Sequence, residues 1–190
     1  DREMSRELYY ECDGHAFDSV IRRDLKVTDE DIDTLCKQMK EVAIANGKSD
    51  LQRAAVKDVT KNVLISWGIL KRSEDGNVYP TNAYFYLTGQ GGLRSMIQCG
   101  VFKGTTRAVF LDRRNYEGPL WEQVDEAVKF VLRNIRMGCR LEGVYRQDIY
   151  ELPPDSIREL IVNAVMNCSY IQASNIQVAI YDDRLEITSP

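Results

Sequence analysis

The amino-acid sequence predicts an α+β protein with a mostly helical first half and a mixed second half. Apolar residues recur at helical spacing in several segments, and short alternating apolar runs bounded by Gly, Pro or Asp lie between and after them. With 190 residues and 44% hydrophobic side chains, the chain can bury one substantial core, or one modest core and a small satellite domain. We therefore expect a folded, soluble chain that forms part of a larger protein.

The first half is expected to form short helices in series. Thr28 is the natural N-cap of an amphipathic helix with apolar residues at i, i+3, i+4 and i+7. A second helical stretch covers about residues 50–57. A third starts at Thr60 and ends at Gly68.

A hairpin is expected after the third helix, because two short extended runs flank Asp75-Gly76, a pair that favours tight turns. This is a winged-helix-like order, in which the third helix would enter the DNA major groove and the hairpin would form the wing. The third helix has no arginine to pair with guanine, so a packing or dimerisation role stays open beside DNA binding. Its polar residues are Lys61, Asn62 and Ser66.

The second half is expected to combine strands with two long helices, after a glycine-rich stretch at 88–94. Pro119 fits the first position of one helix, and Ser156 begins the other, whose apolar stripe includes Leu160. The predicted strands cover 95–102, 107–111, 140–145, 175–181 and 184–188. The predicted regions are 1–27, a tail of a preceding domain or a linker; 28–92, helical and winged-helix-like; and 93–190, α+β.

Composition argues against several functional classes. A net charge of −4 does not suit a chain that binds nucleic acid over its whole surface. The five cysteines are odd in number and contain no C-x-x-C pair, which argues against a disulfide framework or zinc site and predicts a cytoplasmic protein. No stretch approaches the ~18 apolar residues of a membrane helix, so no membrane partner is expected. The single histidine, His15, is expected at the surface.

Two polar residues four positions apart, Glu159 and Asn163, form the candidate site. On a helix they share one face, away from the apolar stripe. In a functional interpretation, Asn163 offers an amide oxygen to a magnesium ion carrying nucleotide phosphates, and Glu159 orients or deprotonates the attacking water. In a structural interpretation, Ser156 and Glu159 form a capping box. The spacing leaves both open, and the two roles are compatible.

The run from Glu159 to Val165, followed by Tyr170 and the strand pair at 176–190, resembles the E-x-x-x-N box and hairpin of the GHKL-type ATPase domain. More narrowly, the chain is similar to RecG-like transcriptional regulators, in which an AlbA-type, Schlafen-like DNA-binding domain precedes the ATPase-like domain. The resemblance covers about residues 60–190 and implies that those before Thr28 are the tail of the AlbA-like domain. Similar connecting segments lie at 79–83, 87–89, 102–104 and 116–120.

The resemblance implies that Glu159 is the catalytic acidic residue, that Asn163 is the magnesium ligand, and that Asn167 borders the nucleotide. Relatives usually follow the box with His-Arg-Asp-Tyr, whereas this chain has Asn167-Cys168-Ser169-Tyr170. The glycine-bearing adenine box and the ATP lid would lie at or beyond Pro190. We therefore expect Mg-ATP to bind the full-length protein, and this chain alone to form a truncated ATPase domain that binds nucleotide weakly or not at all.

The expected function is the central part of a DNA-associated transcriptional regulator that contacts DNA through the full-length protein. One alternative is a non-catalytic scaffold or homodimerisation module with a vestigial nucleotide box. A second alternative is direct DNA binding by the winged-helix-like half. A helicase role has little support, because no Walker motif occurs in the chain.

Overall fold

The chain folds as two compact units, Asp1–Leu87 and Thr88–Pro190, in a computed structural model. The break falls at the start of the glycine-rich stretch. The first unit is largely helical and the second is mixed, which confirms the predicted α+β class. His15 and the first part of the expected tail lie outside the described residues. The structure describes residues 16–91, 96–142, 145–172 and 174–190.

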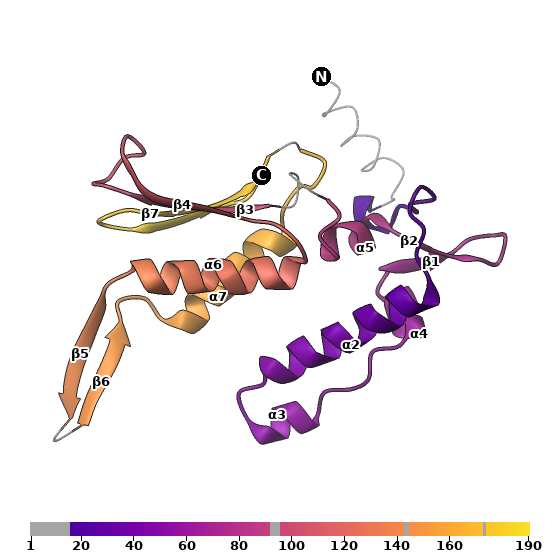
Figure 1. Ribbon diagram of the computed structural model, residues 1–190, viewed down its shortest axis with the longest axis horizontal. Coiled ribbons are helices and arrows are strands. Elements are labelled where there is room, and N and C mark those ends of the chain that lie inside the picture. Colours follow the sequence, from indigo (N-terminus) through magenta and orange to yellow (C-terminus); the bar gives the residue numbers. More distant parts are fainter. Residues whose placement is uncertain (1–15, 92–95, 143–144, 173) are drawn as a thin grey trace. The chain divides into compact units, whose positions relative to one another are not determined.

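Among the described residues of the first unit, three α-helices precede a hairpin and a further short helix (Figure 1). The predicted cap of the first of these helices is confirmed: the Thr28 hydroxyl accepts from the Asp31 N–H at 3.2 Å, and the Asp31 carboxylate accepts from the Thr28 N–H at 2.8 Å. The hairpin turns at Gly76, whose φ of 80° favours glycine. The elements are η1 (Phe17–Ser19), α2 (Asp29–Ala45), α3 (Asp50–Ala54), α4 (Lys61–Ser66), β1 (Leu70–Arg72), β2 (Val78–Pro80) and α5 (Asn82–Leu87).

Buried Asn82 joins residues 16–22 to this unit, although they fall in the segment expected to be a tail or linker. Its amide nitrogen donates to the Phe17 carbonyl at 2.8 Å, and its backbone N–H donates to the Val20 carbonyl at 3.0 Å. The Arg22 guanidinium lies 4.0 Å from the centre of the Phe85 ring. These contacts explain α5, a helix that the sequence analysis did not predict.

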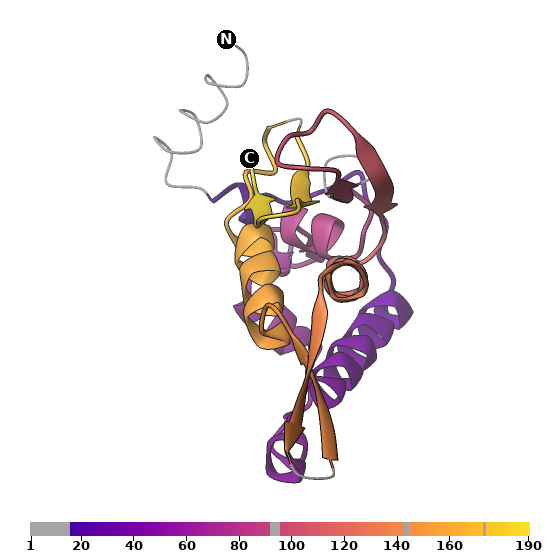
Figure 2. The ribbon, with the colours of Figure 1, turned by 90° about the vertical axis from the view of Figure 1, so that its left-hand side faces the viewer.

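The second unit contains one mixed sheet in the order β4-β3-β7-β8, with β3 and β7 parallel and the other pairs antiparallel. Figures 1 and 2 show α6 and α7 beneath the same face of this sheet. Strands β5 and β6 pair with each other as a separate hairpin. The elements are β3 (Ile97–Phe102), β4 (Phe110–Tyr116), α6 (Leu120–Asn134), β5 (Met137–Glu142), β6 (Tyr145–Tyr150), α7 (Pro154–Met166), β7 (Ile176–Ile180) and β8 (Leu185–Thr188).

Two predicted strands needed correction. The strand expected at 107–111 begins only at Phe110, because the Lys103 N–H donates to the Val109 carbonyl at 3.0 Å and so closes a longer loop. The strand expected at 140–145 is the end of β5 and the start of β6. The strands predicted near 95–102, 175–181 and 184–188 are confirmed within two residues by β3, β7 and β8.

The core of the second unit lies between the helices and the sheet. The apolar stripe of α6 is buried as predicted, although Pro119 is the N-cap residue and not the first helical residue. Gln123, only 1% exposed, is the polar exception. Its side-chain oxygen accepts from the Ile97 N–H at 3.0 Å, and its amide nitrogen donates to the Gly118 carbonyl at 2.7 Å. Gln123 therefore fixes α6 to the first residue of β3.

Candidate functional site

The helix that carries the candidate site begins earlier than predicted. Helix α7 starts at Pro154, with Pro153 as its N-cap residue and no side-chain cap. Proline suits the first helical position, because its φ is already helical and the missing N–H would have no partner there. Ser156 is therefore inside the helix, and the predicted capping box with Glu159 is wrong. Glu159 therefore does not cap the helix, and the structural alternative to its catalytic interpretation is removed.

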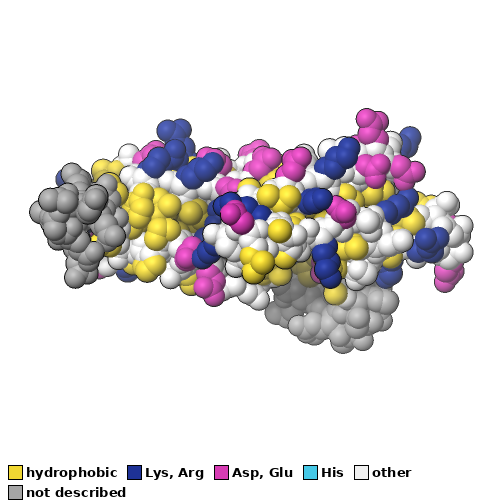
Figure 3. Space-filling model, turned by 90° about the horizontal axis from the view of Figure 1, so that it is seen from below, with side chains coloured by type: hydrophobic (Ala, Val, Ile, Leu, Met, Phe, Trp, Pro, Cys, Tyr) yellow, Lys and Arg dark blue, Asp and Glu magenta, His cyan; other side chains and the backbone are white. Residues whose placement is uncertain are grey.

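Helix α7 buries one side and exposes the side that carries Glu159 and Asn163. Leu160 is 52% exposed, so its predicted place in the buried stripe is wrong. Met166 is 76% exposed, and Val162 also lies at the surface. Figure 3, which looks at the helical side of this unit, shows hydrophobic side chains gathered there. The buried stripe consists of Ile157, Ile161, Ala164 and Val165.

Asn167 ends α7. Its backbone N–H and its side-chain amide nitrogen both donate to the Asn163 carbonyl, at 3.0 and 2.8 Å. The Pro190 carbonyl accepts from the Ser169 N–H at 3.0 Å. The last residue of the chain therefore lies just beyond the end of α7 that carries Asn163 and Asn167.

Contacts with α6 set the orientation of α7. The Arg158 guanidinium donates to the Asp125 carboxylate at 2.6 Å, and both side chains are partly exposed. Glu159, which follows Arg158, is exposed to solvent.

The side-chain groups of Glu159 and Asn163 have no hydrogen-bond or ion-pair partner among the described residues. Within the same part of the chain, no three His, Cys, Asp or Glu residues lie close enough to hold a metal ion. Magnesium commonly takes one or two protein oxygens and fills its other positions with phosphate oxygens and water. A free amide oxygen beside a free carboxylate fits that donor set.

The polar residues of α4 are only partly available for DNA. The Lys61 ammonium lies 2.7 Å from the Asp29 carboxylate, and the Ser66 hydroxyl donates to the Val63 carbonyl at 2.8 Å. Asn62 is exposed. In the described parts of the chain, no helix is both long and apolar enough to cross a membrane.

Comparison with known proteins gives a likeness in fold. No family model matches the chain, and no curated protein matches it. Among solved structures, the chain is similar to the DIP2311 protein from Corynebacterium diphtheriae, with a TM-score of 0.61 and 21% identity. The match covers 100% of this chain and 36% of that protein, so the chain spans about a third of its length.

Proposed function

We propose that this chain is the central, partial ATPase-like portion of a DNA-associated transcriptional regulator of the RecG-like kind. The observation that carries the proposal is the exposed pair on α7. Glu159 and Asn163 lie one turn apart on a helix packed against a mixed sheet, and neither side chain caps, pairs or packs in the described structure.

In this proposal each side chain of the pair has one task. The Asn163 amide oxygen holds a magnesium ion, and the Glu159 carboxylate orients or deprotonates the attacking water. Bound Mg-ATP supplies the phosphoryl group and the metal charge that stabilises its transfer. Asn167 borders the nucleotide and, through its two hydrogen bonds to the Asn163 carbonyl, holds the last turn of α7 in place.

In this proposal, residues of the full-length protein outside the 190-residue chain complete the nucleotide site. The Pro190 carbonyl bonds to Ser169, so residues that follow Pro190 in a longer protein would begin beside the C-terminal end of α7. Exposed Leu160 and Met166 give such residues an apolar surface to cover. Without such residues the adenine and triphosphate stay open to water, and we expect the 190-residue chain to bind Mg-ATP weakly or not at all.

The alternative is a non-catalytic scaffold or homodimerisation module. The same exposed apolar side chains of α7 favour it, because a second protein surface would also cover them. In that case Glu159 and Asn163 are vestigial, and replacing them changes neither nucleotide binding nor stability.

A second candidate is direct DNA binding by the first unit, favoured by the hairpin. Lys71 and Arg72 are exposed on β1, and the Arg23 guanidinium lies 5.4 Å from the centre of the Tyr79 ring on β2. Replacing both Lys71 and Arg72 by Gln should then weaken duplex DNA binding and lower its salt dependence. Unchanged binding would remove this candidate.

The test of the proposed function is a calorimetric titration of Mg-ATP. It compares the 190-residue chain, a longer chain that continues past Pro190, and Asn163→Ala in the longer chain. We expect heat of binding only from the unsubstituted longer chain. Folded protein without binding in all three samples would overturn the proposal and leave the scaffold.

Two matched variants control for the substitutions. Asn62→Ala also replaces an exposed helical asparagine, but outside the candidate site, and should leave nucleotide binding intact. Glu159→Ala should abolish ATP hydrolysis and change the free energy of unfolding by less than about 0.5 kcal/mol, because Glu159 caps nothing. A loss of about 0.5 to 2 kcal/mol without a change in hydrolysis would mean that Glu159 supports folding and has no catalytic role.

A further inference from the structure

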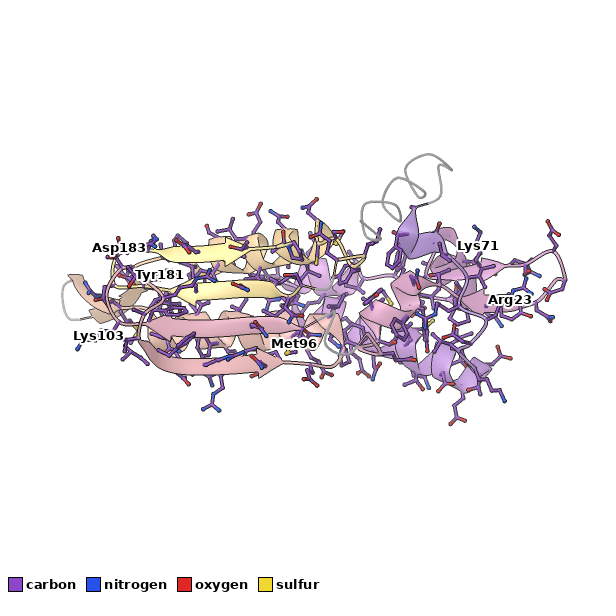
Figure 4. All side chains as sticks on the ribbon, turned by 90° about the horizontal axis from the view of Figure 1, so that it is seen from above. Arg23, Lys71, Met96, Lys103, Tyr181 and Asp183 are labelled. Atoms are coloured by element: carbon purple, nitrogen blue, oxygen red, sulfur yellow. The ribbon has the colours of Figure 1, made fainter. Side chains whose placement is uncertain are left out.

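Among the described residues of the second unit, no helix covers the face of the sheet opposite to α6 and α7. Figure 4 looks onto this face, with Tyr181 and Lys103 at one end of the strands and Met96 at the other. Residues paired across neighbouring strands point to the same side of a sheet. Ile97 and Cys99 face the helices and are buried, so the alternate residues of β3 face outward.

The register places the outward side chains in three rows across the strands. The first row contains hydrogen-bonding side chains: Asn115, Gln98, Gln177 and Thr188. The second has two small residues between two charged ones: Arg113, Gly100, Ala179 and Glu186. The third row is aromatic: Phe110, Phe102 and Tyr181.

The small residues of the second row leave a hollow between the polar row and the aromatic row. A cavity of about 180 Å³ lies there, lined by Gly100, Gln98, Phe102 and Arg113, among others. A Cβ atom at Gly100 would lie 3.2 Å from the Phe102 ring, closer than ordinary van der Waals contact, so glycine lets this ring lie close to the β3 backbone beside the hollow. Phe110, 55% exposed, packs on Phe102 at a centroid distance of 4.5 Å.

Two arginines border the hollow. Arg107 is held in place: its guanidinium donates to the Tyr181 hydroxyl at 2.9 Å and to the Gln177 side-chain oxygen at 2.6 Å. Arg113 is exposed, and its guanidinium has no hydrogen-bond or ion-pair partner among the described residues. The facing acid, Glu186, is engaged by Arg184 at 2.7 Å, and this hydrogen bond lowers the pKa of Glu186. The hollow therefore retains an unpaired positive charge.

We propose that this face binds single-stranded nucleic acid, with one base in the hollow and a neighbouring phosphate on Arg113. The chemistry of the three rows fits such a partner. An exposed aromatic ring offers stacking, side-chain amides offer hydrogen bonds to base edges, and arginine neutralises phosphate. The site lies on the opposite side of the sheet from α7 and does not depend on nucleotide binding at Asn163.

Two neighbouring arginines give a matched test. Arg113 pairs with Gly100 and faces the hollow, whereas Arg114 pairs with Cys99 and lies on the helix side, although both side chains are exposed. Fluorescence anisotropy would follow a labelled oligo(dT) of about 12 nucleotides binding to the 190-residue chain at about 50 mM salt. We expect Arg113→Gln to weaken binding about threefold or more and Arg114→Gln to leave it nearly unchanged.

The aromatic row and the form of the nucleic acid give further readouts. Phe110→Ala should weaken binding about fivefold or more through lost stacking. A duplex of the same length should bind more weakly than the single strand, because its bases are already stacked and paired. Free thymidine monophosphate should compete only poorly, because it lacks the neighbouring phosphates.

Three results would overturn the proposal. The first is the absence of single-strand binding at low salt. The second is equal loss on replacing Arg113 and Arg114, which would indicate unspecific charge attraction. The third is a chain that self-associates in sedimentation experiments and loses this self-association, but not its oligonucleotide binding, in Phe110→Ala. That result would mean that the face binds a second copy of the chain.

Discussion

The hydrogen bonds of Gln123 give the sharpest test of how the second unit is held together. Replacing Gln123 by Met keeps the length and approximate volume of the side chain and removes both bonds. The buried Ile97 N–H then has no partner, which costs about 1–3 kcal/mol. Losing the bond to the Gly118 carbonyl, which is part-buried and can turn to water, adds about 0.5–1.5 kcal/mol. We expect a total loss of about 2–4 kcal/mol.

Urea unfolding followed by tryptophan fluorescence measures this loss. Trp121 lies in α6 and Trp67 in the first unit, so a Trp67→Phe background makes the signal report on the second unit alone. With a urea dependence of about 1–3 kcal/mol per molar, the midpoint should fall by about 1 M or more.

The control is Glu122→Met, which introduces the same side chain at the exposed neighbouring position of α6. It removes an acidic residue from the first turn and should cost less than about 1 kcal/mol. If Gln123→Met shifted the midpoint no further than Glu122→Met, the two hydrogen bonds would contribute nothing measurable. This would refute the argument that leaving the buried Ile97 N–H without a partner lowers the free energy of unfolding.

Two further predictions concern α2 and a buried thiol. In a Trp121→Phe background, thermal melts followed through Trp67 should show that Thr28→Ala destabilises the first unit by about 0.5–2 kcal/mol, whereas Thr34→Ala inside the same helix should not. The backbone N–H and the hydroxyl of Thr28 both donate to the Asp31 carboxylate and lower the pKa of Asp31, and Thr28→Ala removes only the hydroxyl bond. The contribution of that bond is present above the ordinary aspartate pKa of about 3.9 and is lost as pH falls through the lowered pKa. The melting difference between wild type and Thr28→Ala should therefore shrink in acid, and a constant difference would contradict this. Burial raises the pKa of Cys99 to about 12, so iodoacetamide at about pH 8 should label it only after unfolding; peptide mass mapping checks this, and labelling of the folded chain would contradict it.

Several elements could be predicted because their causes are local. The Thr28 cap, the apolar spacing of α6 and the Asp75-Gly76 turn each depend on residues within one or two turns of chain. Helix α5 was missed for the opposite reason. Its start depends on buried Asn82, whose partners lie far back in the sequence.

The candidate site was predictable in part. The four-residue spacing of Glu159 and Asn163 places them on one face of any helix, and both are exposed on α7. The sequence could not decide whether Glu159 caps that helix, because Pro153 and Ser156 are both plausible boundaries. The observed start at Pro154 excludes the cap.

The outer face of the sheet depends on strand partners that the sequence does not reveal. Alternation within β3 indicates that Gln98, Gly100 and Phe102 share a side. Only the parallel pairing of β3 with the distant β7 places Gly100 beside Ala179 and so forms the floor of the hollow. Helix caps, turns and side-chain periodicity were determined by the sequence itself, because each depends on neighbours along the chain. The sheet order and the three rows were decided by the tertiary structure, because they join residues that only folding brings together.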